Sequence, residues 1–271
     1  MNVVLVQMQS GSSIDENLKE ACRYIEQAVT EHQPDLLVFP ENFLCMGSKD
    51  YMKLAGEFEN AIMELTQYSR RHCVALLLGS IPFPSAVNSK KCYSRSILID
   101  KQGAELGAYD KVHLFDVTIG DEQKNYRESD RFEAGQKTCV LQLDGHFLGL
   151  SICYDLRFPG LYQCLREKGA EIIAVPSAFT YKTGQAHWLT LLKARAIETQ
   201  CFVLAVNQSG EHPHAEGGIP RKTWGHSAII DPWGDVLCQL DDKPGICTAR
   251  LDFTKMKEIR LAMPVVEHKR F

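Results

Sequence analysis

The segment LGLSICYDLRFPG, residues 148–160, holds the signals from which the fold of this chain can first be predicted. It begins as an apolar, strand-like run that ends at Cys153, and its Pro159-Gly160 pair turns the chain toward a helical pattern near residues 161–168. The next apolar run, residues 172–175, has the length of a buried strand. Strand, helix and strand in this order are typical of an α/β protein.

The same alternation extends from this segment toward both ends of the chain. Ser13 and Glu16 form a capping box that predicts the start of a helix, and Asp144-Gly145 is a favoured two-residue hairpin turn. We expect strands at residues 3–8, 36–39, 74–79, 202–207 and 246–251. Helices are expected after Ser13 and at residues 58–71 and 187–198. Three hairpins are expected to pair 93–99 with 105–109, 139–143 with 147–152, and 227–230 with 235–238. Because no linker or repeat interrupts the pattern, residues 1–271 are predicted to form a single α/β domain with mixed sheet.

Composition excludes several classes of protein. The chain has 271 residues, of which 45% are hydrophobic and 24% charged, so it can build a large core and is not disordered. Its net charge of −4 gives no basic footprint for nucleic acid or for an acidic membrane surface. No apolar run approaches the ~18 residues of a membrane span, and no secretory signal pattern follows Met1. We therefore expect a cytoplasmic protein that binds neither nucleic acid nor membrane.

Cysteines and histidines give little support for disulfides or metal. The ten cysteines are scattered through apolar runs with no C-x-x-C pair, and disulfide frameworks belong to short secreted chains, so we expect mostly buried, reduced thiols. The tightest histidine pair, His212-Pro213-His214, is interpreted as a surface loop rather than a metal site. The chain has no G-x-G-x-x-G, P-loop or H-E-x-x-H motif, which removes the usual support for nucleotide cofactors and for zinc.

Three long stretches show neither a strand nor a helix pattern. They cover residues 80–91, 113–131 and 208–222. Irregular loops of this length in a compact domain often carry function, so we expect some of them near a site.

Three reactive side chains follow strand-like runs, where a fold can bring strand ends together. Cys153 is expected near helix-terminal amides, which favour a thiolate and an oxyanion. Glu41 is flanked by apolar residues, so we expect a raised pKa and a role as general base, and Lys111 is suited to stabilise a developing oxyanion. Taken singly, each is better explained as a half-buried thiol, a solvated carboxylate or a surface lysine. Together they indicate nucleophilic catalysis, with His113 and His187 as alternative bases.

The segments around these three residues resemble the signature segments of the nitrilase superfamily of carbon–nitrogen hydrolases. The resemblance covers essentially the whole chain. The segments are Phe39-Pro40-Glu41, Asp110-Lys111-Val112-His113-Leu114 and Ile152-Cys153-Tyr154-Asp155-Leu156-Arg157-Phe158-Pro159, with further matches at residues 4–8, 126–129, 176–179, 183–188, 195–200, 224–227 and 263–265. The resemblance implies a four-layer α-β-β-α sandwich, usually paired between subunits, so we expect a homodimer or a higher homo-oligomer.

The resemblance also implies a role for each catalytic residue. Cys153 corresponds to the nucleophile, Glu41 to the general base and Lys111 to the stabiliser of the oxyanion. Glu128 matches a second glutamate that positions the lysine and the substrate amine, and the backbone amide of Tyr154 supplies the other oxyanion donor. The implied enzyme is an amidase that acts on a small-molecule amide through a thioester and needs neither a metal nor an organic cofactor.

Within the superfamily, the chain resembles the branch that holds deaminated glutathione amidases and omega-amidases. Residues 176–179 and 195–201 are closer to the former, which implies hydrolysis of deaminated glutathione to 2-oxoglutarate and cysteinylglycine. Arg157 is then expected to bind the oxoglutaryl carboxylate, and Phe179 and Thr183 to line the same pocket. A structural ion pair of this arginine with Asp155 or Glu128 is the alternative.

Two departures from the family pattern leave the substrate less constrained than the chemistry. Gly160 stands where an acidic residue is expected, and the loop from Gln208 to Lys222 is longer than in the relatives. The alternative functions are therefore an omega-amidase that acts on 2-oxoglutaramate or a related short carboxylated amide, and a catalytically silent interaction protein.

Overall fold

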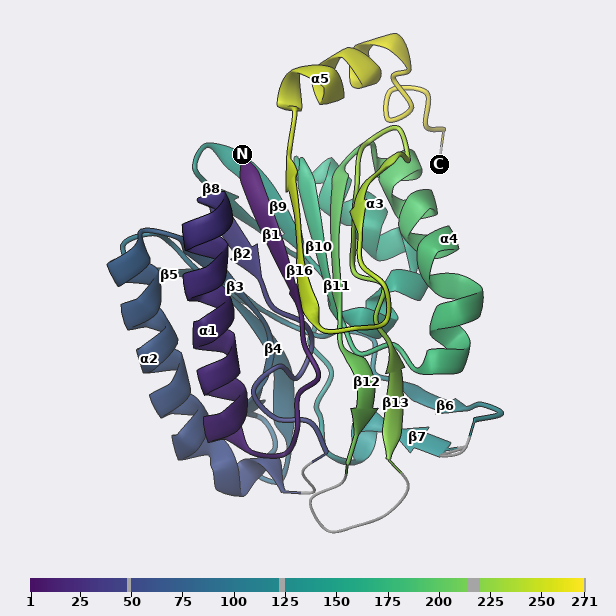
Figure 1. Cartoon of the computed structure of the whole chain (residues 1–271). Helices are drawn as coiled ribbons and strands as arrows, with labels where there is room; N and C mark the ends of the chain where they lie inside the picture. Colours follow the sequence, from purple (N-terminus) through teal and green to yellow (C-terminus); the bar gives the residue numbers. More distant parts are fainter. Residues whose placement is uncertain (48–49, 122–124, 214–219, 271) are drawn as a thin grey trace.

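Two β-sheets pack face to face, and helices cover the outer face of each (Figure 1). The computed structural model describes residues 1–47, 50–121, 125–213 and 220–270. One sheet carries α1 (Ile14–His32) and α2 (Ala55–His72), and the other carries α3 (Pro159–Glu167) and α4 (Tyr181–Thr199). The layers follow the order α-β-β-α, as predicted, and α5 (Phe253–Ala262) lies beyond the sheets near the C-terminus.

Each sheet has six strands with parallel strands at its centre. The order in the first sheet is β16 (Gly245–Arg250), β1 (Asn2–Gln7), β2 (Leu36–Val38), β3 (Ala75–Pro84), β4 (Cys92–Ile99) and β5 (Glu105–Asp110). The order in the second is β15 (Val236–Gln239), β14 (Ala228–Ile230), β11 (Phe202–Asn207), β10 (Ile172–Ser177), β9 (His146–Leu150) and β8 (Cys139–Leu143). Two short ladders pair β6 (Asp116–Thr118) with β7 (Asn125–Arg127), and β12 (Ser209–His212) with β13 (Arg221–Trp224).

Side chains of the first sheet alternate between two hydrophobic cores. In β1, Val3 and Leu5 face the second sheet, whereas Val4 and Val6 pack with the helices α1 and α2. Successive side chains of a strand point to opposite faces, so a sheet covered on both faces needs apolar residues at every position. This is why the central strands appear in the sequence as continuous apolar runs.

Local signals in the sequence correctly predicted a helix start and a hairpin turn. The Ser13 side chain accepts a hydrogen bond from the backbone amide of Glu16 and caps α1. Asp144 and Gly145 have φ values of 48° and 83°, the left-handed backbone that a two-residue turn between β8 and β9 requires.

The stretches expected to be irregular are partly ordered. β3 extends to Pro84, and the ladders β6–β7 and β12–β13 occupy parts of the two other stretches. The prediction of a surface loop at His212 is wrong, because this ring is buried between Ser10 and Thr223, with contacts of 2.8 Å and 2.7 Å; His214 lies outside the described residues. Helix α4 also begins earlier than predicted, and the sequence patterns did not reveal α5.

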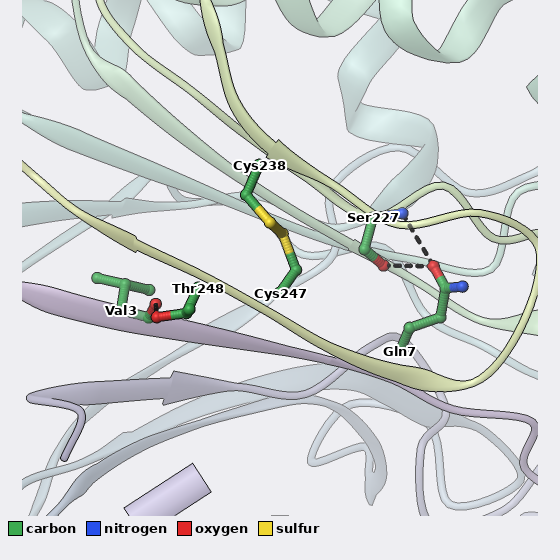
Figure 2. Close-up of a disulfide and its surroundings, with 6 residues drawn as sticks. All are labelled: Val3, Gln7, Ser227, Cys238, Cys247 and Thr248. Atoms are coloured by element: carbon green, nitrogen blue, oxygen red, sulfur yellow. Dashed lines mark hydrogen bonds between the residues drawn. A yellow bond between two sulfur atoms is a disulfide. The ribbon is translucent and has the colours of Figure 1, made fainter. Parts of the chain in front are cut away.

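One pair of cysteines departs from the expectation of reduced thiols. Cys238 of β15 and Cys247 of β16 form a disulfide that joins the edge strands of the two sheets (Figure 2). Close by, the carboxamide oxygen of Gln7 in β1 accepts hydrogen bonds from the amide and hydroxyl of Ser227, over 2.9 Å and 2.8 Å. The sequence could not show this pairing, because it depends on how two different sheets align. The buried free cysteines are Cys22, Cys45, Cys92, Cys153 and Cys201, as expected for small apolar side chains.

Two negative observations hold for the described residues. None of their helices combines the length and the hydropathy needed to cross a bilayer. No group of three or more His, Cys, Asp and Glu side chains among them is arranged to hold a metal ion.

Candidate active site

Glu41, Lys111 and Cys153 come together just beyond the ends of three strands. Glu41 follows β2, Lys111 follows β5 and Cys153 follows β9. Gly79 of β3 allows the segment of Glu41 to pass close by, because a Cβ atom at this position would lie 2.1 Å from the carbonyl oxygen of Pro40. Only glycine permits such a close approach of two backbones.

A sharp turn in the backbone aims the thiol of Cys153. This residue begins the short 3-10 helix η3 (Cys153–Arg157) and has a φ of 49°, in the left-handed region that side chains other than glycine rarely adopt. The carboxylate of Asp155 fixes the turn, since it accepts hydrogen bonds from the amide of Ile152 over 2.9 Å and from the hydroxyl of Tyr109 over 2.8 Å. The turn is thereby tied to β5, the strand that leads to Lys111.

The ammonium group of Lys111 is held between two carboxylates. Its Nζ lies 2.7 Å from Oε1 of Glu41, and 3.0 Å and 2.9 Å from the two carboxylate oxygens of Glu128. Lys111 is only 1% exposed and Glu41 only 2%. Charge-assisted hydrogen bonds from a single buried ammonium fix its position relative to both carboxylates.

Burial and charge together set the protonation state of these groups. Burial disfavours the ionised form of Glu41, but the Lys111 ammonium and the positive charge of Arg221 bring its pKa below the ordinary value of 4.5. Our expectation of a raised pKa for Glu41 is therefore wrong, because the sequence did not reveal the contact with Lys111. Burial raises the pKa of Glu128. The positive charge of Lys111 opposes this rise, and repulsion from the Glu41 carboxylate adds to it. Lys111 itself stays protonated, since the two glutamates raise its pKa against the effect of burial.

The thiol of Cys153 is neutral in the resting site. Burial raises its pKa, the negative charge of Glu41 raises it further, and Lys111 only partly compensates. The expected preference for a thiolate is therefore not found in the free protein. A neutral thiol beside an ionised carboxylate can still become a nucleophile by passing its proton to that carboxylate during attack.

The three residues line a cavity of about 360 Å³. Five further residues predicted for the site line the same cavity: Glu128, Tyr154, Arg157, Phe179 and Thr183. The structure thus brings all eight predicted site residues together, and their roles remain predictions.

Arg157 is placed against aromatic rings rather than in a salt bridge. Its guanidinium carbon lies 5.8 Å from the ring centre of Tyr154 and 5.5 Å from that of Phe179, and its Nη2 is 3.2 Å from Nδ1 of His187. No ion pair joins Arg157 to Asp155 or to any other carboxylate of the described ranges. The alternative of a structural ion pair is therefore wrong, and the guanidinium remains available to a ligand.

The two histidines considered as bases are engaged elsewhere. The Nδ1 atom of His113 lies 2.7 Å from the Asp155 carboxylate, and its ring stacks on Phe158 at 3.7 Å. His187 contacts Arg157, and neither histidine lines the cavity. Glu41 is therefore the base candidate that the geometry favours.

Tyr51 and Arg221 are among the cavity residues that the sequence analysis did not predict. Tyr51 lies in the short 3-10 helix η1 (Tyr51–Leu54), and Arg221 lies in β13, within a stretch expected to be irregular. Neither residue belongs to a segment that resembles a family signature. The four residues of β13, Arg-Lys-Thr-Trp, show no alternation of apolar and polar side chains, so the sequence held no signal for a strand that meets a cavity.

The chain is similar over its length to known hydrolases. The model of the carbon–nitrogen hydrolase family matches residues 2–261. A deaminated glutathione amidase from Yersinia enterocolitica is 41% identical over 273 residues, which cover 100% of this chain and 93% of the relative. The Caenorhabditis elegans NitFhit protein matches with a TM-score of 0.91 and 33% identity over 99% of this chain, which spans only 65% of that protein. Saccharomyces cerevisiae Nit3, a member of branch 10 of the nitrilase superfamily, matches with a TM-score of 0.86 and 29% identity over 100% of this chain and 97% of its own.

Proposed function

The chain belongs to the carbon–nitrogen hydrolase family of the nitrilase superfamily, and on this premise we propose that Cys153 is the nucleophile of an amidase. Membership establishes a hydrolase of carbon–nitrogen bonds other than peptide bonds. The observation that carries the proposal is the buried Lys111 ammonium, which contacts the Glu41 carboxylate in the cavity that also contains the Cys153 thiol. The arrangement combines a nucleophile, a base and an oxyanion donor.

The reaction proceeds in two halves through a thioester. Glu41 accepts the thiol proton as the sulfur of Cys153 attacks the amide carbonyl carbon. Lys111 and the backbone amide of Tyr154 donate hydrogen bonds to the oxyanion that forms. The carbon–nitrogen bond then breaks, and the amine leaves with the proton held by Glu41. Water, deprotonated by the same carboxylate, attacks the thioester and releases the acid and the free thiol.

Glu128 acts on Lys111 rather than on the substrate carbonyl. Its two oxygens hold the ammonium, and its Oε2 also accepts a hydrogen bond from the amide of Phe115 over 2.6 Å. A lysine fixed in this way needs little reorganisation when the oxyanion forms, which is how preorganised donors lower a barrier.

The proposed substrate is deaminated glutathione, hydrolysed to 2-oxoglutarate and cysteinylglycine. The similarity to a deaminated glutathione amidase supports this choice, and so does Arg157, whose guanidinium lines the cavity and can bind the oxoglutaryl carboxylate. Phe179 and Thr183 are proposed to contact the same acyl group. The second candidate is an omega-amidase that acts on 2-oxoglutaramate, because Arg157 would serve that substrate equally well.

A catalytically silent interaction protein is disfavoured by the buried charges. Keeping an ammonium and a carboxylate out of water is costly, and such a cluster is retained where chemistry needs it. We further propose one domain, a cytoplasmic location and a homodimer or higher homo-oligomer. The exposed side chains of Ile197 in α4 and Trp233 before β15, which are 48% and 57% accessible, support association between copies.

The deciding experiment gives the purified protein deaminated glutathione and 2-oxoglutaramate separately and measures release of 2-oxoglutarate. Cys153→Ala is the control for non-enzymatic release. Much faster release from deaminated glutathione supports the proposal, and preference for 2-oxoglutaramate favours the omega-amidase. No release from either compound would contradict both substrates.

A further inference from the structure

Arg221 lines the cavity without a carboxylate partner among the described residues. Its Nη2 donates to the carbonyl oxygen of Ala178 over 2.6 Å, and its guanidinium carbon lies 5.6 Å from the ring centre of Tyr126. Its Nε is buried and has no hydrogen-bond partner within the part of the chain described. Lys111, by contrast, is held by two carboxylates. A guanidinium carries five N–H donors, so an arginine that lines a cavity and has no counter-charge can bind an anion.

Arg221 lies on the Glu41 side of the nucleophile, as its contact with Ala178 and its effect on the Glu41 carboxylate together indicate. Ala178, whose carbonyl Arg221 contacts, has a backbone amide that faces the Cys153 sulfur. The positive charge of Arg221 is also near enough to lower the pKa of Glu41. Arg157 contacts different side chains and none of the groups that Arg221 touches. The cavity therefore has two separate guanidinium groups.

We infer that Arg221 binds a carboxylate carried by the leaving amine of the substrate. The inference rests on the proposed function, in which Glu41 returns its proton to the departing nitrogen. The leaving group must then lie on the Glu41 side of the acyl carbon, which is the side of Arg221. Arg157 is left to bind the carboxylate of the acyl group. The substrate class is thus an amide with a carboxylate on each side of the scissile bond.

Deaminated glutathione has this form, with one carboxylate on its 2-oxoglutaryl group and another on the glycine of cysteinylglycine. 2-Oxoglutaramate releases ammonia and presents no second anion to Arg221. Arg221 is therefore the residue that distinguishes the two candidate substrates on the leaving side.

The test removes the proposed ion pair in two ways, by changing Arg221 and by neutralising the carboxylate of the substrate. Arg221→Gln and the wild type are assayed on deaminated glutathione and on the same compound with its glycine carboxylate converted to the amide. In Arg221→Gln, the ratio of kcat/KM for the acid to kcat/KM for the amide is expected to fall about 10- to 100-fold. This is the size of effect that hydrogen bonds to a charged group have on binding. Because the ratio compares two substrates on one enzyme, a general effect on Glu41 cancels.

Lys222→Gln is the matched control. Lys222 is the next residue of β13, is exposed and lies over the ring of Tyr181, so its loss removes the same charge outside the cavity. The acid-to-amide ratio is expected to stay unchanged in this variant. An equal fall for both substrates in Arg221→Gln, or a fall of the ratio in Lys222→Gln, would overturn the inference.

Product binding separates failure of the inference from failure of the proposed function. Calorimetry compares cysteinylglycine with its C-terminal amide on the wild type and on Arg221→Gln. The wild type is expected to bind the acid about 10-fold or more tightly than the amide, and Arg221→Gln to lose that preference. If the wild type hydrolyses neither substrate, the proposed function fails; equal binding of acid and amide by the wild type would overturn the role of Arg221 whatever the turnover.

Discussion

The Nζ atom of Lys111 donates a hydrogen bond to Oε1 of Glu41 over 2.7 Å, and both side chains are almost fully buried. This contact keeps Glu41 ionised in an environment that would otherwise neutralise it. Glu41 can therefore accept a proton from the neutral thiol of Cys153. The proposed base and the proposed oxyanion donor thus depend on each other, and a change in one alters the charge of the other.

Glu41→Gln is expected to lower kcat about 100- to 10,000-fold, the usual contribution of a general base. Glutamine keeps the size of the side chain and an oxygen acceptor for Lys111, so the fold should persist. Steady-state kinetics and a thermal unfolding curve measure the two effects. Asp130→Asn is the control, since Asp130 is an exposed carboxylate that lines the same cavity. Activity of Glu41→Gln close to that of Asp130→Asn would exclude Glu41 as the base.

Cys153→Ala should abolish turnover, a loss on the order of 10⁶-fold for a covalent nucleophile. The thiol fills little volume at the end of a strand, so circular dichroism and the unfolding midpoint should remain close to wild type. Cys92→Ala is a suitable control, because Cys92 is also buried but does not line the cavity. A folded Cys153→Ala protein with full activity would remove the thioester from the mechanism.

Glu128→Gln tests positioning of Lys111 without touching the thiol. Glutamine can still accept the hydrogen bond from the Phe115 amide, but it no longer repels Glu41 or shares the ammonium charge. Lys111 then acts on Glu41 alone, so the pKa of Glu41 should fall further and the acid limb of kcat/KM should move to lower pH. We expect kcat to fall about 10- to 100-fold, as for a misplaced catalytic group. A lower kcat with an unmoved acid limb would show a merely structural role.

The buried His212 predicts a loss of stability in mild acid. Burial, with the nearby charge of Arg221, lowers its pKa to about 4 from an ordinary value of 6.5, although the Ser10 carbonyl opposes this. Between these values the unfolded chain binds a proton that the folded protein does not, so the free energy of unfolding falls as pH falls from 6.5 toward 4. Between pH 7 and pH 5 the loss from this group is up to about 2 kcal/mol.

His212→Gln, which cannot titrate, isolates this contribution. Its unfolding free energy should vary less between pH 7 and pH 5 than that of the wild type, whatever its absolute stability. Chemical denaturation at the two pH values gives both numbers. Parallel pH dependence in the two proteins would show that His212 is protonated equally in the folded and unfolded states.

Much of the fold could be predicted because its signals are local. The apolar runs, the Ser13 cap and the Asp144-Gly145 turn each act over a few residues, and the structure contains the elements they indicate. The Cys238–Cys247 disulfide could not be predicted, because it depends on the alignment of edge strands from two sheets. The short ladder β12–β13 was missed for a related reason, since it pairs strands across a long connection.

The candidate site also has features that local sequence signals predict and features that only the fold reveals. Cys153, Glu41 and Lys111 were found because each follows a strand and belongs to a family segment. The direction of the Glu41 pKa shift was wrong, because it is decided by a contact between residues 70 positions apart. Arg221 was missed, because only the folded β13 shows that its side chain reaches the cavity.

The central claim is that the acyl group passes through a thioester on Cys153. The most direct measurement mixes the enzyme with excess deaminated glutathione, quenches it in acid within the first turnovers and determines its intact mass, followed by peptide mapping. The account predicts a mass increase of one 2-oxoglutaryl group, located on Cys153 and absent from Cys153→Ala. Release of 2-oxoglutarate by Cys153→Ala at the wild-type rate, or an acyl group on a different residue, would contradict it.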